Sequence, residues 1–159
     1  MRRVSRRGLE MKRICWLIVA SLLGACSPAP SFTDARGKSV SLSDFAGKPL
    51  LVNYFAPWCA PCLREMPLLA ALHQEGQIGV LAINYDPASP IELAALARQH
   101  QIAVPLMIPV DERSLPFPRP TVLPTSYLLD GHGKLQETLV GELDTQKLAS
   151  IKALLLKPE

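Results

Sequence analysis

Cysteine is scarce in this chain, with four among 159 residues, and two of the four lie within the first 26. A structural zinc site normally takes four Cys or His ligands. After residue 26 only one close cysteine pair remains, and the three histidines are scattered. The sequence also lacks internal repeats. These absences argue against a structural zinc module and against a repeat architecture.

The chain also lacks an apolar run long enough for a membrane-spanning helix, which needs about 20 residues. The run at residues 14–23 has only ten. It follows six basic residues, which are Arg2, Arg3, Arg6, Arg7, Lys12 and Arg13. A basic segment followed by a short apolar core is typical of a signal peptide. We therefore predict an export signal over residues 1–25, with translation starting at Met1 or Met11.

Positive charge is not in excess in the rest of the chain. Residues 1–25 hold six of the 17 Lys and Arg and one of the 14 Asp and Glu, so the other 134 residues carry 11 against 13, about −2. Because nucleic-acid binding depends on a basic surface, we predict no nucleic-acid partner. A length of 134 residues suits one domain with one core.

The end of the predicted signal, Leu23-Gly24-Ala25-Cys26, resembles a bacterial lipobox. In that motif the cysteine is lipidated and becomes the mature N-terminus, so Cys26 is the expected lipid anchor. The Pro- and Ser-rich residues 26–31 are the expected tether, followed by one domain over residues 32–159. The protein would then be anchored at the periplasmic or extracytoplasmic face of a membrane. The alternative is ordinary cleavage near Ala25, which leaves a soluble protein.

From residue 32 the chain alternates predicted strands and helices, which is typical of an α/β fold with a parallel-type core. Two short extended pieces flank a turn at Arg36-Gly37-Lys38. Apolar patterns predict strands at 50–55, 79–85 and 104–110, and helices after Cys62, over 90–100 and over 144–155. An antiparallel hairpin is expected from residues 126–129 and 135–140 around a turn at 130–133.

The sequence Cys59-Ala60-Pro61-Cys62 lies between a predicted strand and the helix that follows it. Two thiols with this spacing can close a disulfide within one turn. If the turn begins a helix, the first sulfur faces the positive end of the helix dipole, which lowers its pKa and makes it a nucleophile. The pattern therefore predicts dithiol–disulfide exchange without a cofactor. A metal-binding or thiol-sensing protein that uses the same pair is the alternative.

Three motifs occur together: Gly47-Lys48-Pro49, the segment 56–67 around the cysteines, and Leu123-Pro124-Thr125. In this combination they resemble the thioredoxin superfamily, and more narrowly its TlpA/ResA-like thiol-disulfide oxidoreductases. The resemblance implies a thioredoxin-like α/β fold, in which helices flank a central mixed β-sheet with an N-terminal β-hairpin extension. It also implies a protein-disulfide reductase that is exported or membrane-tethered.

By this resemblance Cys59 is the attacking thiolate and Cys62 the resolving thiol of a redox-active disulfide. The helix dipole argument gives the same order. Glu65 follows Cys62 by three residues, and the resemblance gives it the resolving cysteine's proton. The alternative for Glu65 is a solvated helix carboxylate beside Arg64. Asn53 stands where thioredoxin has a buried aspartate, which makes Glu65 the more interesting proton acceptor.

The same resemblance predicts the substrate-binding surface. Pro124 matches a cis-proline that faces the cysteine pair, and Leu123 before it would offer its backbone to a substrate peptide. Trp58 is expected to cover the disulfide and shape this surface, and Pro61 belongs to it as well. For Trp58 a simple packing role is the alternative.

The direction of electron flow is predicted from Pro61. Strongly oxidising relatives have a histidine before the second cysteine, which stabilises the thiolate and the reduced form. With proline there, we predict a reductant of exported protein disulfides. The resemblance to the TlpA/ResA-like proteins further implies apocytochrome c as a candidate substrate and a membrane thiol-reductant as electron donor. A disulfide-forming oxidant is the alternative.

Overall fold

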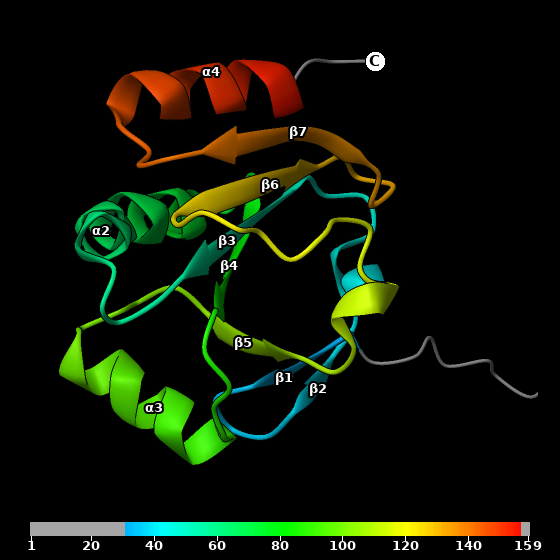
Figure 1. The fold of residues 1–159 in the computed structure, drawn as a ribbon. Coiled ribbons are helices and arrows are strands. Elements are labelled where there is room, and N and C mark those ends of the chain that lie inside the picture. The colour runs from blue at the N-terminus through cyan, green and yellow to red at the C-terminus, as the bar shows by residue number, and fades with distance from the viewer. Residues whose placement is uncertain (1–30, 157–159) are drawn as a thin grey trace, which may run out of the picture.

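The computed structural model of the protein describes residues 31–156. The predicted signal peptide and Cys26 lie outside the described residues. Seven strands form one sheet in the order β2-β1-β5-β4-β3-β6-β7 (Figure 1). Their bounds are β1 Phe32–Asp34, β2 Ser39–Val40, β3 Leu50–Phe55, β4 Gly79–Asn84, β5 Leu106–Pro109, β6 Thr125–Leu129 and β7 Leu135–Val140.

The sheet is mixed, as expected. The pairs β3/β4 and β4/β5 are parallel, whereas β1/β2, β1/β5, β3/β6 and β6/β7 are antiparallel. The predicted N-terminal hairpin is therefore present as β1 and β2, and the predicted C-terminal hairpin as β6 and β7. The segment predicted as a strand over 104–110 is shorter, and only Leu106–Pro109 forms β5.

Within residues 31–156, three α-helices accompany the sheet, and each begins with a cap. They are α2 Ala60–Glu75, α3 Pro90–Gln99 and α4 Thr145–Leu155; the 3₁₀ turns are η2 Leu42–Phe45 and η3 Glu112–Ser114. Ser89 caps α3 in a capping box with Glu92, and Asp144 caps α4. The predicted inner face of α4 is confirmed, with Leu148 and Ile151 buried.

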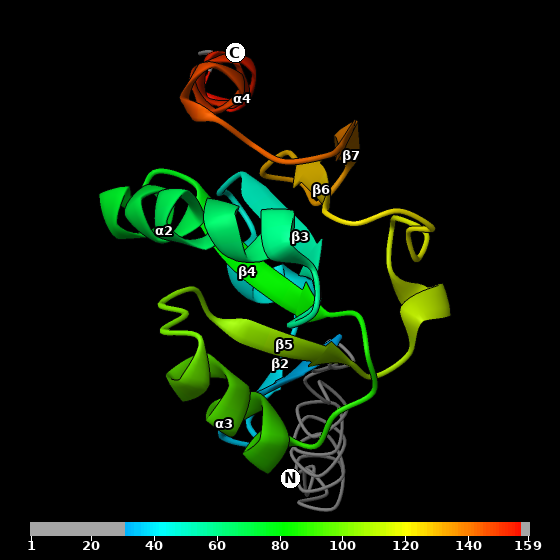
Figure 2. The ribbon, with the colours of Figure 1, turned by 60° about the vertical axis from the view of Figure 1, so that its left-hand side comes forward.

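The two faces of the sheet differ in what covers them. Side chains alternate along β3, so that Leu51 and Phe55 pack in a core cluster with residues of all three helices. Val52 and Tyr54 point the other way, into a cluster with Phe117. Figure 2 shows α2 and α3 on one side of the sheet and the segment around η3 on the other. Asn53 follows the same alternation as Leu51 and Phe55, and it therefore faces the helices.

The turn of the β6–β7 hairpin closes the end of the sheet away from the first turn of α2 (Figure 1). The N–H of Gly47 donates to the carbonyl oxygen of Gly131 at 2.7 Å. A Cβ on Gly131 would lie 3.1 Å from the carbonyl carbon of Gly47, so a side chain there would require the Gly47 backbone to move by a few tenths of an ångström. No helix within residues 31–156 is both long and apolar enough to cross a bilayer.

Candidate active site

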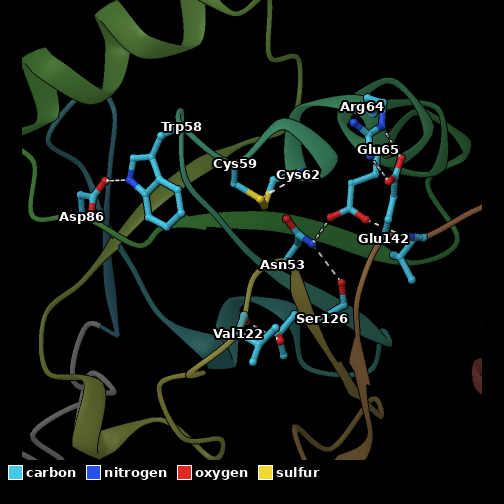
Figure 3. Close-up of a disulfide and its surroundings, with 12 residues drawn as sticks. Asn53, Trp58, Cys59, Cys62, Arg64, Glu65, Asp86, Val122, Ser126 and Glu142 are labelled. Atoms are coloured by element: carbon cyan, nitrogen blue, oxygen red, sulfur yellow. Dashed lines mark hydrogen bonds and ion pairs between the residues drawn. A yellow bond between two sulfur atoms is a disulfide. The ribbon is translucent and has the colours of Figure 1, made fainter.

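The two cysteines lie where β3 passes into α2, and they form a disulfide with a Cα–Cα distance of 5.3 Å (Figure 3). Cys59 is the N-cap of the helix, in extended backbone, and Pro61 lies in the first turn. Proline fits there because the first N–H groups of a helix have no intrahelical partner. The Cys59 residue is 6% exposed, whereas Cys62 is 0% exposed.

The environment of the two sulfurs differs in charge as well as in access. The backbone N–H of Cys62 donates to Sγ of Cys59 at 3.3 Å. This N–H belongs to the first turn of α2, whose orphan donors and dipole favour negative charge. We therefore expect the thiolate of the reduced pair on Cys59 rather than on Cys62, and this stays a prediction.

Glu65 is buried because it lies on the face of α2 that packs on the sheet. The residues Cys62, Glu65, Met66 and Leu69 are all buried on the face of α2 that packs on the sheet. Glu65 is 1% exposed. Its Oε1 accepts from Nδ2 of Asn53 at 2.8 Å and its Oε2 accepts from the backbone N–H of Leu143 at 2.6 Å. The alternative of a solvated helix carboxylate is therefore wrong.

Burial raises the pKa of the Glu65 carboxyl from its ordinary value of 4.5 to about 7, although the hydrogen bonds from Leu143 and Asn53 act in the opposite direction. A carboxyl with this pKa exchanges its proton near neutral pH, and it lies one helical turn beyond Cys62. Its role as proton acceptor for Cys62 stays a prediction.

Asn53 joins the central strand to this helix face. Its Nδ2 donates to Glu65 and also to Oγ of Ser126 at 3.0 Å. Ser126 is the residue opposite Asn53 in the antiparallel pairing of β3 with β6. The amide therefore lies in a buried network that spans β3, α2 and β6.

Arg64 points the other way from Glu65. Its guanidinium makes a two-fold contact with Glu142, through Nε to Oε1 at 3.0 Å and through Nη2 to Oε2 at 2.6 Å. Both side chains reach solvent. The hydrogen bond from Arg64 lowers the pKa of Glu142. Residues 142 and 143 thus contact α2 in two places. Glu142 forms this solvent-exposed ion pair with Arg64, and the N–H of Leu143 donates to the buried Glu65.

Trp58 stands beside the disulfide and is 65% exposed. Its indole N–H donates to Oδ2 of Asp86 at 2.7 Å, and its ring meets the ring of Tyr85 edge to face. The guanidinium carbon of Arg119 lies over the ring of Tyr85, 4.2 Å from its centre. In Figure 3 the indole is directed toward Asp86, at the side of the sulfurs.

The peptide bond between Leu123 and Pro124 is cis, as expected. The carbonyl oxygen of Pro124 accepts from the N–H of Gly141 at 2.8 Å, and Oγ1 of Thr125 donates to the carbonyl of Val122. Within residues 31–156, neither the N–H nor the carbonyl oxygen of Leu123 has a hydrogen-bond partner. The use of this backbone by a substrate stays a prediction, as do the substrate-binding roles of Trp58 and Pro61.

A profile of the AhpC/TSA family matches residues 23–138, more than half of the chain. The thiol-disulfide oxidoreductase ResA of a Bacillus cereus strain is 31% identical over 125 residues, which cover 76% of this chain and 72% of ResA. The chain belongs to the ResA-like thiol-disulfide oxidoreductases of the AhpC/TSA family. A thioredoxin-like protein of Bacillus subtilis, YneN, is 31% identical over 130 residues, 79% of this chain and 75% of YneN.

Solved structures of related proteins share this fold. A candidate thioredoxin from Neisseria meningitidis is 31% identical, with a TM-score of 0.65 over 82% of this chain and 89% of that one. A thiol:disulfide interchange protein of the thioredoxin family from Chlorobium tepidum is 25% identical, with a TM-score of 0.66 over 82% and 97%. The thioredoxin-like fold and the family resemblance are confirmed. The protein is a thiol-disulfide oxidoreductase.

Sequence reasoning missed several members of this oxidoreductase site. It did not find Ser126, the backbone N–H of Leu143, or the Asp86 that holds Trp58. Ser126 was not found because the sequence predicted the strand that contains it without predicting its pairing with β3, which places Ser126 opposite Asn53. Leu143 acts through its backbone, and no side-chain pattern signals that. Among residues 31–156 no group of three or more His, Cys, Asp or Glu is arranged to hold a metal ion.

Proposed function

We propose that the protein reduces disulfide bonds in exported proteins, with Cys59 as the attacking sulfur and Cys62 as the resolving sulfur. The observation that carries this proposal is the position of Cys59. Cys59 is the more exposed of the two residues, and its sulfur accepts a hydrogen bond from the first turn of α2. A thiolate is the reactive form of cysteine, and this position favours it.

In the first step the Cys59 thiolate attacks one sulfur of the substrate disulfide. A bond forms between Cys59 and that sulfur, the substrate S–S bond breaks, and the second substrate sulfur leaves as a thiolate that takes a proton from solvent. In the second step Cys62 attacks Sγ of Cys59, which restores the intramolecular disulfide and releases the first substrate sulfur. The substrate gains two electrons and two protons, and an external thiol donor must then reduce the pair again.

The second step needs a thiolate on a buried residue, so Cys62 must lose a proton without contact with solvent. Glu65 supports this step, because it lies one turn further along the same buried face and its pKa of about 7 suits a general base at neutral pH. Glu65 becomes neutral when it accepts this proton. When it ionises again, the hydrogen bonds from Asn53 and Leu143 stabilise the carboxylate.

The substrate peptide would lie across the surface next to the disulfide. The unpaired backbone of Leu123 offers one donor and one acceptor to an extended chain, beside Pro124. The exposed indole of Trp58 and the first-turn Pro61 offer apolar contact to the same peptide.

We further propose that the protein works outside the cytoplasm, tethered by a lipid on Cys26 through residues 26–31. The sequence of residues 1–26 supports this proposal. A membrane thiol-reductant would supply electrons, because an oxidising compartment does not. A haem-binding Cys-x-x-Cys of apocytochrome c is the candidate substrate, since haem attachment requires its thiols to be reduced.

Partner trapping tests the order of the two cysteines. Cys62→Ser should stall the mixed disulfide at Cys59 and retain exported proteins that a thiol reagent releases, whereas Cys59→Ser should retain none. Trapping by Cys59→Ser alone would reverse the assigned roles. Loss of insulin-disulfide reduction in both variants, without loss of folding, separates this chemistry from metal binding or thiol sensing.

Equilibration with glutathione tests the direction of electron flow. A reductant should have a potential more negative than about −200 mV, the range of thiol reductants and of the cytosolic glutathione pool. A value near −120 mV would instead indicate a disulfide-forming oxidant.

Two cellular measurements test the location and the substrate. Labelled fatty acid should enter the wild-type protein and not Cys26→Ser. Loss of the protein should lower the content of c-type cytochromes, and an added small thiol should restore it. Normal cytochrome content in the deletion strain would exclude apocytochrome c as the required substrate.

A further inference from the structure

One polar atom beside the disulfide has no partner. Oδ1 of Asn53 is fully buried, and no hydrogen-bond donor of residues 31–156 reaches it. Buried amide oxygens nearly always accept a hydrogen bond, and one without a donor is destabilising. A donor is therefore expected in another state of the protein.

The nitrogen of the same amide fixes where this oxygen lies. Nδ2 donates to Oε1 of Glu65 and to Oγ of Ser126. When Glu65 is ionised it has no proton to donate, so the amide nitrogen of Asn53 lies on the Glu65 side and donates to it. The oxygen is left on the opposite side, and Figure 3 shows it directed toward the disulfide between Cys59 and Cys62.

The fold brings Asn53 and Cys62 to one interface. Asn53 belongs to the face of β3 that packs on α2, and Cys62 belongs to the face of α2 that packs on the sheet. Both residues are 0% exposed, so solvent does not compete for either. Each oxygen of Glu65 already accepts one hydrogen bond, from Asn53 or Leu143, whereas Oδ1 of Asn53 accepts none.

We propose that Oδ1 of Asn53 is the hydrogen-bond acceptor for the thiol of Cys62 in the reduced protein. In the disulfide form Cys62 has no proton to donate, and the oxygen lacks a partner. In the dithiol form the S–H of Cys62 donates to it. Asn53 thereby holds the resolving thiol in its protonated form next to Glu65 until the mixed disulfide has formed.

The reduction step balances with an external dithiol such as dithiothreitol. The reagent gives two electrons and two protons and closes its own disulfide. The Cys59–Cys62 bond breaks, one proton stays on Cys62 and binds Asn53, and the other goes to Cys59 or to solvent. Since only the reduced form gains a hydrogen bond, Asn53 favours the dithiol. This inference needs only that the disulfide is reducible, so it stands independently of the physiological direction and substrate.

The S–H stretching band of Cys62 reports this hydrogen bond directly. The infrared spectrum of Cys59→Ser minus that of Cys59→Ser/Cys62→Ser isolates the Cys62 band in the full chain, because other cysteines cancel. Adding Asn53→Leu to both proteins removes the proposed acceptor, and leucine has nearly the same shape as asparagine. The Cys62 band should then move to higher frequency and become narrower. An unchanged band in Asn53→Leu would overturn the proposal.

Two further variants separate the oxygen of Asn53 from its nitrogen. Ser126→Ala removes one partner of Nδ2 and keeps Oδ1, so the band should stay in place. Asn53→Asp, measured near pH 5 where the acid can donate to Glu65 and still accept from Cys62, should restore the low-frequency band. These variants also keep the proposal testable if Asn53→Leu fails to fold. A band at higher frequency in Ser126→Ala, or at higher frequency in Asn53→Asp near pH 5, contradicts it.

The redox equilibrium gives a second readout that a loss of packing does not imitate. In the otherwise unsubstituted protein, Asn53→Leu should shift the equilibrium with glutathione up to about tenfold toward the disulfide. This corresponds to a potential about 30 mV more negative. A shift toward the dithiol, or none, would contradict the proposed acceptor role.

Discussion

Arg64 and Glu65 are neighbours in α2, and both bind the segment 142–143, but in opposite surroundings. Arg64 forms a solvated ion pair with Glu142, whose pKa is lowered. Glu65 is buried and binds the N–H of Leu143, and its pKa is raised to about 7. Two consecutive residues of α2 therefore differ in role. Arg64 makes a surface contact, whereas Glu65 has a pKa suited to proton transfer near neutral pH.

The difference arises from solvent rather than from the number of contacts. Each carboxylate accepts two hydrogen bonds from neighbouring residues. The partners of Glu65 are neutral N–H groups in a site without water contact, so burial outweighs them. The partner of Glu142 is a guanidinium in a half-exposed site, where desolvation is weaker and the ion pair prevails.

The strongest test of the comparison is kinetic. Glu65→Gln should slow disulfide exchange by between about 10²-fold and 10⁴-fold, the usual contribution of a general base. The wild-type rate should rise through pH 7 as Glu65 ionises, and the variant should lack this inflection. Stopped-flow measurement of single turnovers over pH 5–9 gives both. The matched variant Glu142→Gln should keep the wild-type rate, and equal slowing in both would remove the distinction.

The second test is the free energy of unfolding of the oxidised protein. The folded pKa of Glu65 lies above its unfolded value, so the folded state binds the proton more tightly. Between pH 4.5 and 7 the unfolded chain ionises first, and stability falls as pH rises. The loss reaches the order of 3 kcal/mol. Urea titrations should show this slope in wild type, and the slope should be absent from Glu65→Gln. Parallel curves for the two proteins would mean that Glu65 ionises normally.

The third test concerns the end of the shared segment. Asp144 follows Leu143 directly and caps α4 by accepting from the N–H of Lys147 at 2.8 Å. Asp144→Ala should lower the free energy of unfolding by about 1 kcal/mol, as loss of a helix cap usually does. Thermal unfolding at pH 7 measures it. If the rate of exchange also falls, Leu143 depends on this cap for its position against Glu65.

The smallest effect is expected at the surface. Arg64→Gln should lower the free energy of unfolding by less than about 1 kcal/mol, because both partners reach solvent. The difference from wild type should shrink between 0.05 and 1 M salt, since salt screens exposed charges. A larger or salt-insensitive effect would show that the outer contact is as important to the fold as the inner one.

The fold was predictable from the sequence because its elements carry strong local patterns. The apolar run of β3, the spacing of Met66, Leu69 and Leu72, and the turn at 130–133 each indicate one element type, and each is present. The cysteine pair was predictable for the same reason, since its chemistry requires adjacency in sequence.

The surroundings of the cysteines were predictable only in part. Glu65 was left between a buried and a solvated position, because the helical pattern does not fix how far the 141–143 segment covers it. Asn53 was recognised as a departure from thioredoxin, but its bonds to Glu65 and Ser126 join residues 12 and 73 positions apart. Contacts of that range depend on strand pairing and on backbone donors, which leave no pattern in the sequence.

The close approach of Gly47 and Gly131 determines which end of the domain should open locally. It bonds the start of the central strand to the C-terminal hairpin at one end of the sheet. Amide hydrogens on both sides of this contact should therefore exchange in a single cooperative opening, later than those around the first turn of α2. We therefore expect the Gly47–Gly131 end of the sheet to stay closed while the end that carries the disulfide opens locally.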